Sequence, residues 1–252
     1  MYIDTHAHYD SSKFNSDRDA VLASMPENGV DIIIDPGCDE PSSRAALALA
    51  ERYPFVYAAV GWQPEEWESW DMYSPGVVRE LAAHPKCVAI GEIGLDYYWD
   101  KEHKELMYDM FVTQLELALE LDKPVIIHDR EAHGDCLDIV GRYPKLRGVF
   151  HCFSGSAEMA RELVKRGWYL GFDGPVTYKN ARRAIEALEA CPVERILLET
   201  DSPYLPPVPF RGKRNDSAKL PYIAARIADA KGLETAELAR ITSENARRLF
   251  GI

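Results

Sequence analysis

The chain has 252 residues, of which 46% are hydrophobic and 28% are charged, and its formal net charge is −12 at pH 7. This composition is that of an ordinary globular protein, and it excludes a disordered, collagen-like or coiled-coil chain. The acidic charge excludes a protein that coats nucleic acid through bulk electrostatic attraction, so any contact with nucleic acid has to be local.

Short β-rich segments alternate with longer segments of helical spacing along the chain. Eight strands are predicted, at residues 2–4, 31–34, 56–60, 88–90, 125–127, 149–150, 169–171 and 196–198. Several of them are almost entirely apolar, which is typical of parallel strands that are covered on both faces. Helices are predicted between the strands, at residues 42–52, 102–121, 157–166 and 181–189. Gly167 is expected to cap the third of these helices at its C-terminus.

A proline-rich loop at 202–209 and a basic segment at 210–219 follow the last strand, and a helical region follows them. In that region Leu238, Ile241 and Leu249 fall at helical spacings, and we expect them to pack on the outside of the strands. Eight βα units in 252 residues predict an α/β protein with a (β/α)₈ TIM barrel that forms one domain over residues 1–252. A doubly wound open sheet is the alternative, but it usually has fewer strands, and no G-x-G-x-x-G follows the first strand.

Four histidines and two acidic residues stand at the carboxyl ends of predicted strands, where a barrel brings them to one rim. The residues are His6, His8, Glu92, His128, His151 and Asp201. Six ligands are too many for one ion, so the sequence predicts two divalent cations. One ion is expected to bind His6, His8 and Asp201, the other His128 and His151, with Glu92 as the bridge. Mg²⁺, Mn²⁺, Zn²⁺, Fe²⁺ and Ni²⁺ remain open as the metal.

The other histidines, His84, His103 and His133, lie in helical or loop segments, and we expect them to be surface residues. Cys152 should face away from the ions if the strand before it is regular.

The chain resembles the TatD-related metal-dependent hydrolases, within the amidohydrolase-like barrels, almost from end to end. The segments that carry the resemblance are residues 4–8 (DTHAH), 91–97 (GEIGLDY), 128–132 (HDREA), 151–155 (HCFSG), 199–205 (ETDSPYL) and 211–215 (RGKRN). The resemblance implies a (β/α)₈ hydrolase whose two-metal site uses the matched positions, with deoxyribonuclease activity, often from the 3′ end.

We therefore expect hydrolysis of phosphodiester bonds by a hydroxide that sits between the two metals. Asp201 is the expected catalytic group that orients this water and accepts its proton, and Glu92 takes part as the bridge. A purely structural Asp201, which ligates without proton transfer, is the alternative.

Two cations outweigh two carboxylates, so the field at the site is positive although the whole chain is acidic. Substrate contacts are expected from Arg130 and from the loop residues Arg211, Lys213 and Arg214. Phe153 and Tyr204 are expected to form the wall against which bases of a single or frayed DNA strand stack. Arg182 and Arg183 fit a solvated helix face better than a phosphate contact.

Two positions depart from the family pattern. Gln63 stands in Gly61-Trp62-Gln63-Pro64 where members commonly have Gly-x-His-Pro, which affects substrate preference. The usual Asn-Glu-Pro is replaced by Asn215-Asp216-Ser217, which we expect to alter the start of the following helix more than the chemistry.

Two other functions fit the same pattern. A carbonyl hydrolase would cleave lactones, amides or phosphotriesters, but Glu92 stands where that branch would need a carbamylated lysine. A non-catalytic adaptor would keep the metals for stability alone.

The predicted location is the cytoplasm. The five cysteines form no C-x-x-C pair, the first 19 residues carry six charges, and no apolar run approaches the ~18 residues of a membrane span. The sequence is compatible with a monomer.

Overall fold

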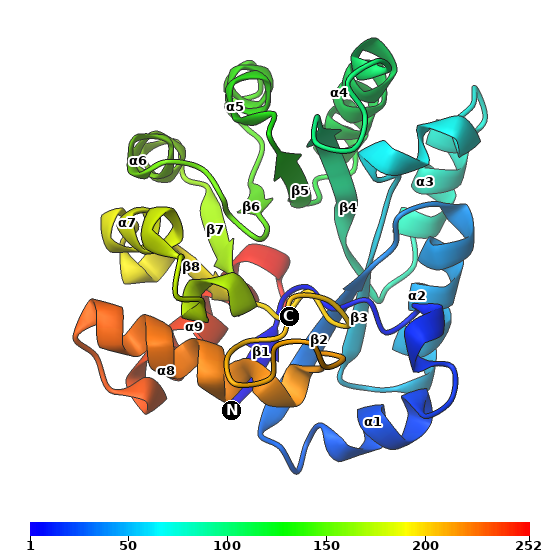
Figure 1. The fold of residues 1–252 in the computed structure, drawn as a ribbon. Helices are drawn as coiled ribbons and strands as arrows, with labels where there is room; N and C mark the ends of the chain where they lie inside the picture. The colour runs from blue at the N-terminus through cyan, green and yellow to red at the C-terminus, as the bar shows by residue number, and fades with distance from the viewer.

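The computed structural model describes residues 1–252 and has eight parallel strands, which lie side by side in the order of the sequence from β1 to β8. The helices surround the strands, as the ribbon in Figure 1 shows, and the predicted (β/α)₈ barrel is confirmed. The strands are β1 (Tyr2–Asp4), β2 (Val30–Pro36), β3 (Val56–Val60), β4 (Cys87–Asp96), β5 (Val125–Arg130), β6 (Gly148–Phe150), β7 (Tyr169–Phe172) and β8 (Ile196–Leu198).

Backbone hydrogen bonds close the barrel between β1 and β8. The Thr5 amide donates to the Leu198 carbonyl over 3.1 Å, and the His8 amide donates to the Ser202 carbonyl over 2.7 Å. The Asp201 amide donates in turn to the His6 carbonyl over 2.9 Å. The two chain segments that carry predicted ligands after β1 and β8 are therefore held directly against each other.

Nine α-helices connect and cover the strands. They are α1 (Arg18–Ser24), α2 (Glu40–Arg52), α3 (Ser74–Ala82), α4 (Lys104–Glu120), α5 (His133–Gly141), α6 (Ala157–Lys165), α7 (Arg182–Ala190), α8 (Leu220–Lys231) and α9 (Thr235–Phe250). Short 3₁₀ turns lie at Ser12–Phe14, Pro64–Ser69, Gly174–Thr177, Val193–Arg195 and Ser217–Lys219. None of the helices combines the length and the apolar character that crossing a membrane requires.

Gly167 follows the end of α6 with a φ of 91°, so the predicted helix cap is confirmed. At the replaced Asn-Glu-Pro, the Asp216 side chain accepts a hydrogen bond from the Ala218 amide and caps the turn that leads into α8.

Two apolar clusters form the core. The larger one joins the outer faces of the strands to the helices, and Leu238 belongs to it. The smaller cluster contains the strand side chains that point to the opposite face from those of the larger cluster. Because successive side chains of a strand point to opposite faces, this smaller cluster fills the barrel interior. Leu249 and Phe250 at the end of α9 belong to this inner cluster. The expectation that Leu249 packs on the outside of the barrel is therefore wrong, because the last turn of α9 covers the interior.

The strand β4 differs most from its predicted range. It spans Cys87–Asp96 and is buried throughout, whereas the sequence predicted a strand that ends at residue 90. Glu92 therefore lies within β4, and His128 lies within β5. A side chain at Gly94, where φ is 150°, would bring its Cβ within 1.9 Å of the His128 carbonyl oxygen. Glycine at this position allows β4 to pair closely with β5 beside the ligands.

Candidate metal centre

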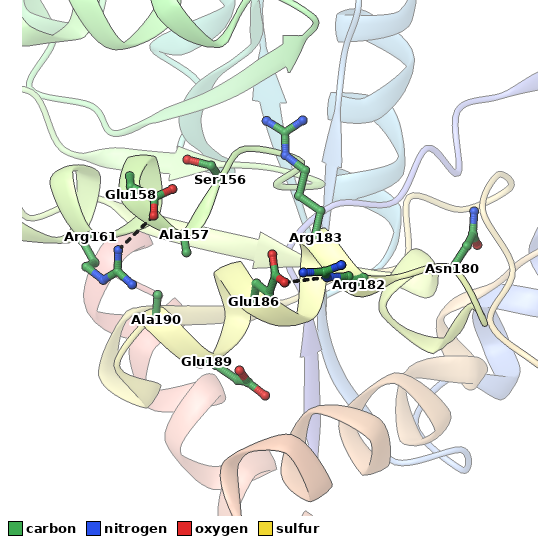
Figure 2. A pocket seen from close by; sticks show the side chains of 10 residues that line it. All are labelled: Ser156, Ala157, Glu158, Arg161, Asn180, Arg182, Arg183, Glu186, Glu189 and Ala190. Atoms are coloured by element: carbon green, nitrogen blue, oxygen red, sulfur yellow. Dashed lines mark hydrogen bonds and ion pairs between the residues drawn. The ribbon is translucent and has the colours of Figure 1, made fainter.

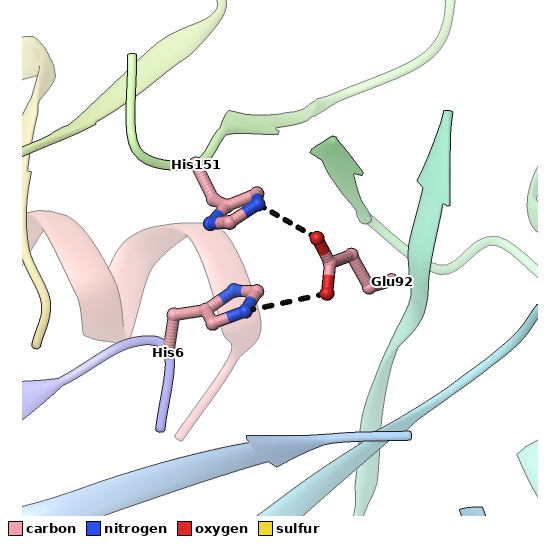
Figure 3. Close-up of side chains that lie close together, drawn as sticks. All are labelled: His6, Glu92 and His151. Carbon is pink, nitrogen blue, oxygen red and sulfur yellow. Dashed lines mark ion pairs between the residues drawn. The ribbon is translucent and has the colours of Figure 1, made fainter. Parts of the chain in front are cut away.

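The six predicted ligands come together at the carboxyl end of the barrel, with the Glu92 carboxylate in the middle. One oxygen of Glu92, Oε1, lies 2.7 Å from His128 Nδ1 and 2.7 Å from His151 Nε2. The other oxygen, Oε2, lies 3.6 Å from His6 Nε2 and 3.7 Å from His8 Nε2. Figure 3 shows His6 and His151 facing different oxygens of this carboxylate.

Asp201 joins the group formed by the first two histidines. Its Oδ1 lies 3.8 Å from His6 Nε2 and 3.6 Å from His8 Nε2. The ligands thus form two sets, His6, His8 and Asp201 on one side and His128 and His151 on the other, and each set faces its own oxygen of Glu92.

Contacts behind the ligands fix the orientation of the imidazole rings. His8 Nδ1 lies 3.1 Å from the Pro36 carbonyl oxygen, and His128 Nε2 lies 2.9 Å from Asp96 Oδ2. The rings of His6 and His151 stack with 3.9 Å between their centroids. Each ring therefore presents one nitrogen to the carboxylates at the centre.

Asp96 lies directly behind the ligand cluster, and it was not among the predicted site residues. Its side chain is fully buried, and its Oδ1 accepts hydrogen bonds from the amides of Tyr98 and Trp99 while its Oδ2 faces His128. Along a strand, Glu92 and Asp96 are four positions apart and point to the same face. This spacing was the available signal, but the strand was expected to end at residue 90.

The loops that carry the ligands are tied to buried polar groups. The Thr200 hydroxyl donates to Asp4 Oδ2 over 2.6 Å, and the Thr200 amide donates to Asp4 Oδ1 over 3.0 Å. The next residue, Asp201, adopts a φ of 54°, a left-handed conformation that aspartate tolerates better than most side chains. These contacts place Asp201 beside His6 and His8.

Protonation differs strongly among the clustered groups. Burial lowers the pKa of His6 to about 4, and the proximity of His151 adds to this shift. Burial disfavours ionisation of Glu92, but the charge of His151 and hydrogen bonds from His128 and His151 outweigh it and hold the pKa of Glu92 well below its ordinary value. For His128, hydrogen bonds to Asp96 and Glu92 outweigh the effect of burial and raise its pKa to about 10.

This set of donors fits divalent metal ions. Imidazole nitrogens with carboxylate oxygens are ligands that Zn²⁺ and other first-row transition ions bind. His6, Glu92 and His151 form one group whose ligand atoms all lie within 4.8 Å of one another, and His6, His8 and Asp201 form another. Metal-binding imidazoles are neutral, so loading the site has to remove the proton that the carboxylates hold on His128.

Two adjoining hollows reach the ligand cluster. The central hollow, of about 610 Å³, is lined by every predicted ligand except the fully buried His6. The side hollow, of about 440 Å³, opens toward β6 and β7 and shares His128, His151 and Asp201 with it. A substrate in either space can reach the same reacting groups.

Three of the predicted substrate contacts lie at these hollows. Arg130 lines both, with its guanidinium 4.0 Å from the centre of the Tyr98 ring. Phe153 is buried in the wall of the side hollow. Tyr204 is exposed at the central hollow, where the Lys13 ammonium lies 4.0 Å above its ring. Lys13 is a cation at the rim that the sequence analysis did not identify.

The three basic residues after β8 are placed differently from one another. Arg211 lies over the ring of Tyr178, which lines the side hollow, at 3.9 Å from the ring centre. Lys213 is exposed and lines neither hollow. Arg214 pairs with Asp17 through two contacts of 2.8 Å and 2.6 Å, so its guanidinium already has a carboxylate partner. A phosphate contact by any of the three stays a prediction.

The remaining histidines stand apart from the cluster. His84 pairs with Glu51, His103 with Asp100 and His133 with Asp129. Gln63 lines the central hollow, but its amide exchanges hydrogen bonds with Glu65. Cys38 Sγ lies 3.9 Å from His8 Nδ1, the nitrogen that points away from Glu92.

Comparison with known proteins gives matches over the whole chain. Residues 3–251 match the family model described as TatD related DNase. The chain is 43% identical over 254 residues to the uncharacterized metal-dependent hydrolase YabD of Bacillus subtilis (strain 168), with 100% of each chain covered. It is 38% identical over 251 residues to the 3′-5′ ssDNA/RNA exonuclease TatD of Escherichia coli (strain K12), with 96% of each covered.

A solved structure agrees with these sequence matches. The crystal structure of YJJV, a TatD homolog from Escherichia coli K12, superposes with a TM-score of 0.94 at 32% identity, and the match covers 100% of this chain and 98% of that one. The similarity therefore includes every strand and loop that carries a predicted ligand.

Proposed function

The chain belongs to the TatD-related deoxyribonuclease family and is a metal-dependent hydrolase that acts on ester bonds, and from this premise we propose that it removes nucleotides from the 3′ end of single-stranded nucleic acid. The named 3′-5′ exonuclease among its relatives supports this choice of substrate. The five cysteines are all free, which suits a reducing compartment, and the proposal includes a location in the cytoplasm.

The division of contacts at Glu92 is the observation that carries the proposal. Its two oxygens face two separate sets of ligands, as a carboxylate that bridges two ions has to do. In the proposed site His6, His8 and Asp201 would hold one divalent cation, His128 and His151 would hold the other, and Glu92 would serve both. Such a pair, when bound, supplies water activation near neutral pH and neutralises the charge of the attacked phosphate.

Asp201 is the group best placed to accept the proton of the attacking water. Its side chain is 15% exposed, against 4% for Glu92, and it lines both hollows. Burial would keep a proton on Asp201, but hydrogen bonding to His8 and the charge of His6 outweigh burial and lower its pKa. An ionised carboxylate that meets solvent at the ligand cluster can orient a water molecule and remove its proton.

A nuclease assay on the full chain tests the proposal. Oligonucleotides labelled at the 5′ end, single-stranded and duplex, are incubated with Mg²⁺, Mn²⁺, Zn²⁺, Fe²⁺ and Ni²⁺ in turn. We expect stepwise shortening of the single strand and no shortening after chelation. The imidazole-rich ligand set favours the transition ions over Mg²⁺. Undiminished hydrolysis by metal-stripped protein would contradict the mechanism.

A panel of lactones, amides and phosphotriesters in the same assay tests the carbonyl hydrolase alternative, which is not favoured. Turnover of one of these compounds without any cleavage of the oligonucleotides would reverse the choice.

A further inference from the structure

The side hollow lies directly beside the reacting groups, because it shares three of the proposed ligands with the central hollow. Its volume of about 440 Å³ falls within the roughly 300–1,000 Å³ of pockets that hold small molecules. Whatever part of a substrate fills it must therefore be attached to the scissile bond or adjacent to it.

The wall of the side hollow is apolar and aromatic. Phe153, Phe172 and Val176 are buried there, and Tyr178 is half-buried. Flat aromatic bases bind on such surfaces with little regard for base identity, because every base offers a π face. The wall suits a nucleoside better than a phosphate.

Two acids also belong to the lining of this hollow. Asp129 Oδ1 and Asp173 Oδ2 are buried and have no hydrogen-bond partner. Both oxygens are closed off from the hollow, so the apolar part of its wall is the surface that a nucleoside meets.

Arg183 lies at the outer end of the hollow. It also lines a groove of about 850 Å³ between α6 and α7, so it stands where the two spaces meet. The other arginines of the groove are already paired, Arg182 with Glu186 at 2.8 Å and Arg161 with Glu158 at 3.5 Å. Figure 2 shows Arg183 projecting away from these pairs, and it makes no ion pair or hydrogen bond of its own.

The opposite side of the metal centre is acidic. Four carboxylates that are not proposed ligands line the central hollow, whereas its cations are Arg130 in the lining and Lys13 above Tyr204 at the rim. These carboxylates belong to Asp10, Asp39, Glu65 and Glu66. The groove on the side of Arg183 is lined by three arginines and three glutamates, so it repels a polyanionic strand less than the acidic side does.

We propose that the side hollow binds one nucleoside of the substrate strand and that Arg183 binds the phosphate that follows it, so the strand leaves the active site toward the groove between α6 and α7. The inference rests on the proposed nuclease function and names the path of its substrate. Arg182 and Arg183 are both exposed on α7, as expected for a solvated helix face, and they differ in that Arg182 pairs with Glu186.

Substrate length separates this role from a general effect on the fold. Wild type, Arg183→Ala and the matched control Arg182→Ala are assayed with Mn²⁺ on a dithymidine dinucleotide and a thymidine 12-mer, both with a free 5′ hydroxyl, and the products are separated by chromatography. Only the 12-mer has phosphates beyond the scissile one. In Arg183→Ala, we expect the ratio of the 12-mer KM to the dinucleotide KM to rise about three- to ten-fold, with kcat for the 12-mer retained. The control is expected to keep the wild-type ratio.

Salt dependence gives an independent measurement. Loss of one phosphate contact lowers the slope of log kcat/KM against log salt by about 0.7 for a single strand, and we expect this change for Arg183→Ala on the 12-mer. Equal KM ratios and equal slopes in the two arginine variants would overturn the assignment of Arg183. Failure of the wild type to cleave either oligonucleotide would instead refute the proposed function.

A second variant tests the nucleoside site itself. Ala181 lines the side hollow just before α7, and Ala181→Phe places a ring in that space. We expect KM to rise for both oligonucleotides, with circular dichroism showing an unchanged fold. Wild-type KM values in this variant would rule out the hollow as the nucleoside site.

Discussion

Asp201 is the most accessible carboxylate of the ligand cluster, and its two proposed roles can be separated by substitution. Asp201→Asn keeps the size of the side chain and one oxygen but removes the base. We expect kcat on a single-stranded oligonucleotide to fall at least about 100-fold, since general base catalysis contributes about 10² to 10⁴. Metal content, measured by mass spectrometry of the purified protein, should stay close to that of the wild type.

A matched substitution far from the site provides the control. Asp138→Asn, on the exposed face of α5, is expected to leave kcat and metal content unchanged. If Asp201→Asn lost metal in proportion to activity, the residue would be a ligand only, and the alternative of a structural Asp201 would hold.

Asp96 is expected to act through His128, which it orients from behind. Removal of such an orienting carboxylate typically costs 10- to 100-fold in metal affinity. We therefore expect Asp96→Asn to weaken Zn²⁺ binding by about this factor in a competition titration with a chromophoric chelator. Asp109→Asn, on the exposed face of α4, is the control. Equal affinities in the two variants would show that Asp96 does not position the ring.

The sequence predicted the six ligands because each has a rare side chain at a recognisable position beside an apolar strand. It did not predict Asp96, whose strand is interrupted by two glycines and a glutamate that obscure the apolar run. It also could not distinguish the surroundings of Arg182 from those of Arg183. These neighbours point in different directions from the folded helix, so only Arg183 lines the side hollow.

At the level of elements, the pairing of β4 with β5 depends on Gly94. An alanine Cβ there would lie 1.9 Å from the His128 carbonyl oxygen, so the two strands would have to move apart. We expect Gly94→Ala to lower the free energy of unfolding by roughly 2–4 kcal/mol in urea titrations. Because the displaced strands carry Glu92 and His128, metal affinity should fall as well.

Gly134 provides the matched substitution in a helix. Nothing lies within 4 Å of a Cβ added at this position of α5. Gly134→Ala should leave the stability unchanged or raise it slightly, because alanine favours helix more than glycine does. A Gly94→Ala variant as stable as Gly134→Ala would show that β4 can shift without cost.

The elements that the sequence predicted are those with a clear periodic signal. The sequence analysis named no helix at α1, α3 or α5, whose apolar residues recur less regularly than those of α6 and α7. The strand β4 was cut short because Gly91, Glu92 and Gly94 resemble a loop in composition. In the folded chain, β4 is buried on both faces and pairs with β3 and β5, and these contacts outweigh the weak strand preference of its glycines and glutamate.

For the whole molecule, we expect removal of the metals to abolish hydrolysis and to leave the barrel folded. Neither of the two apolar clusters that form the core contains a proposed metal ligand, so the packing of the core does not depend on the metals. A ligand that binds only the native state adds roughly 3–4 kcal/mol when it is present at 100 to 1,000 times its Kd, so chelation should lower Tm by several degrees. Circular dichroism and scanning calorimetry with and without chelator measure both effects.

Restoration by added Mn²⁺ is the control for this experiment, since it separates reversible metal loss from damage to the protein. Loss of the helical circular dichroism signal on chelation would show that the metals are needed for folding.

The architecture as a whole followed from counting alternating units, and a barrel of eight such units places all strand ends on one rim. The contacts that close the barrel could not be predicted from this count. Contact between β1 and β8, and the insertion of the last turn of α9 against the barrel interior, join residues that are far apart in the sequence. Local patterns contain no information about such contacts.

The closure of β8 against β1 also affects when activity can begin during translation. Thr5 donates hydrogen bonds to a carbonyl 193 positions later, and Asp201 emerges from the ribosome only after that carbonyl. A nascent chain that ends at β7 therefore contains the four predicted ligand histidines and Glu92, but it lacks Asp201 and the backbone contacts that hold the segment after β1. We therefore expect the predicted metal site to be completed, and hydrolysis to begin, only when synthesis is almost finished.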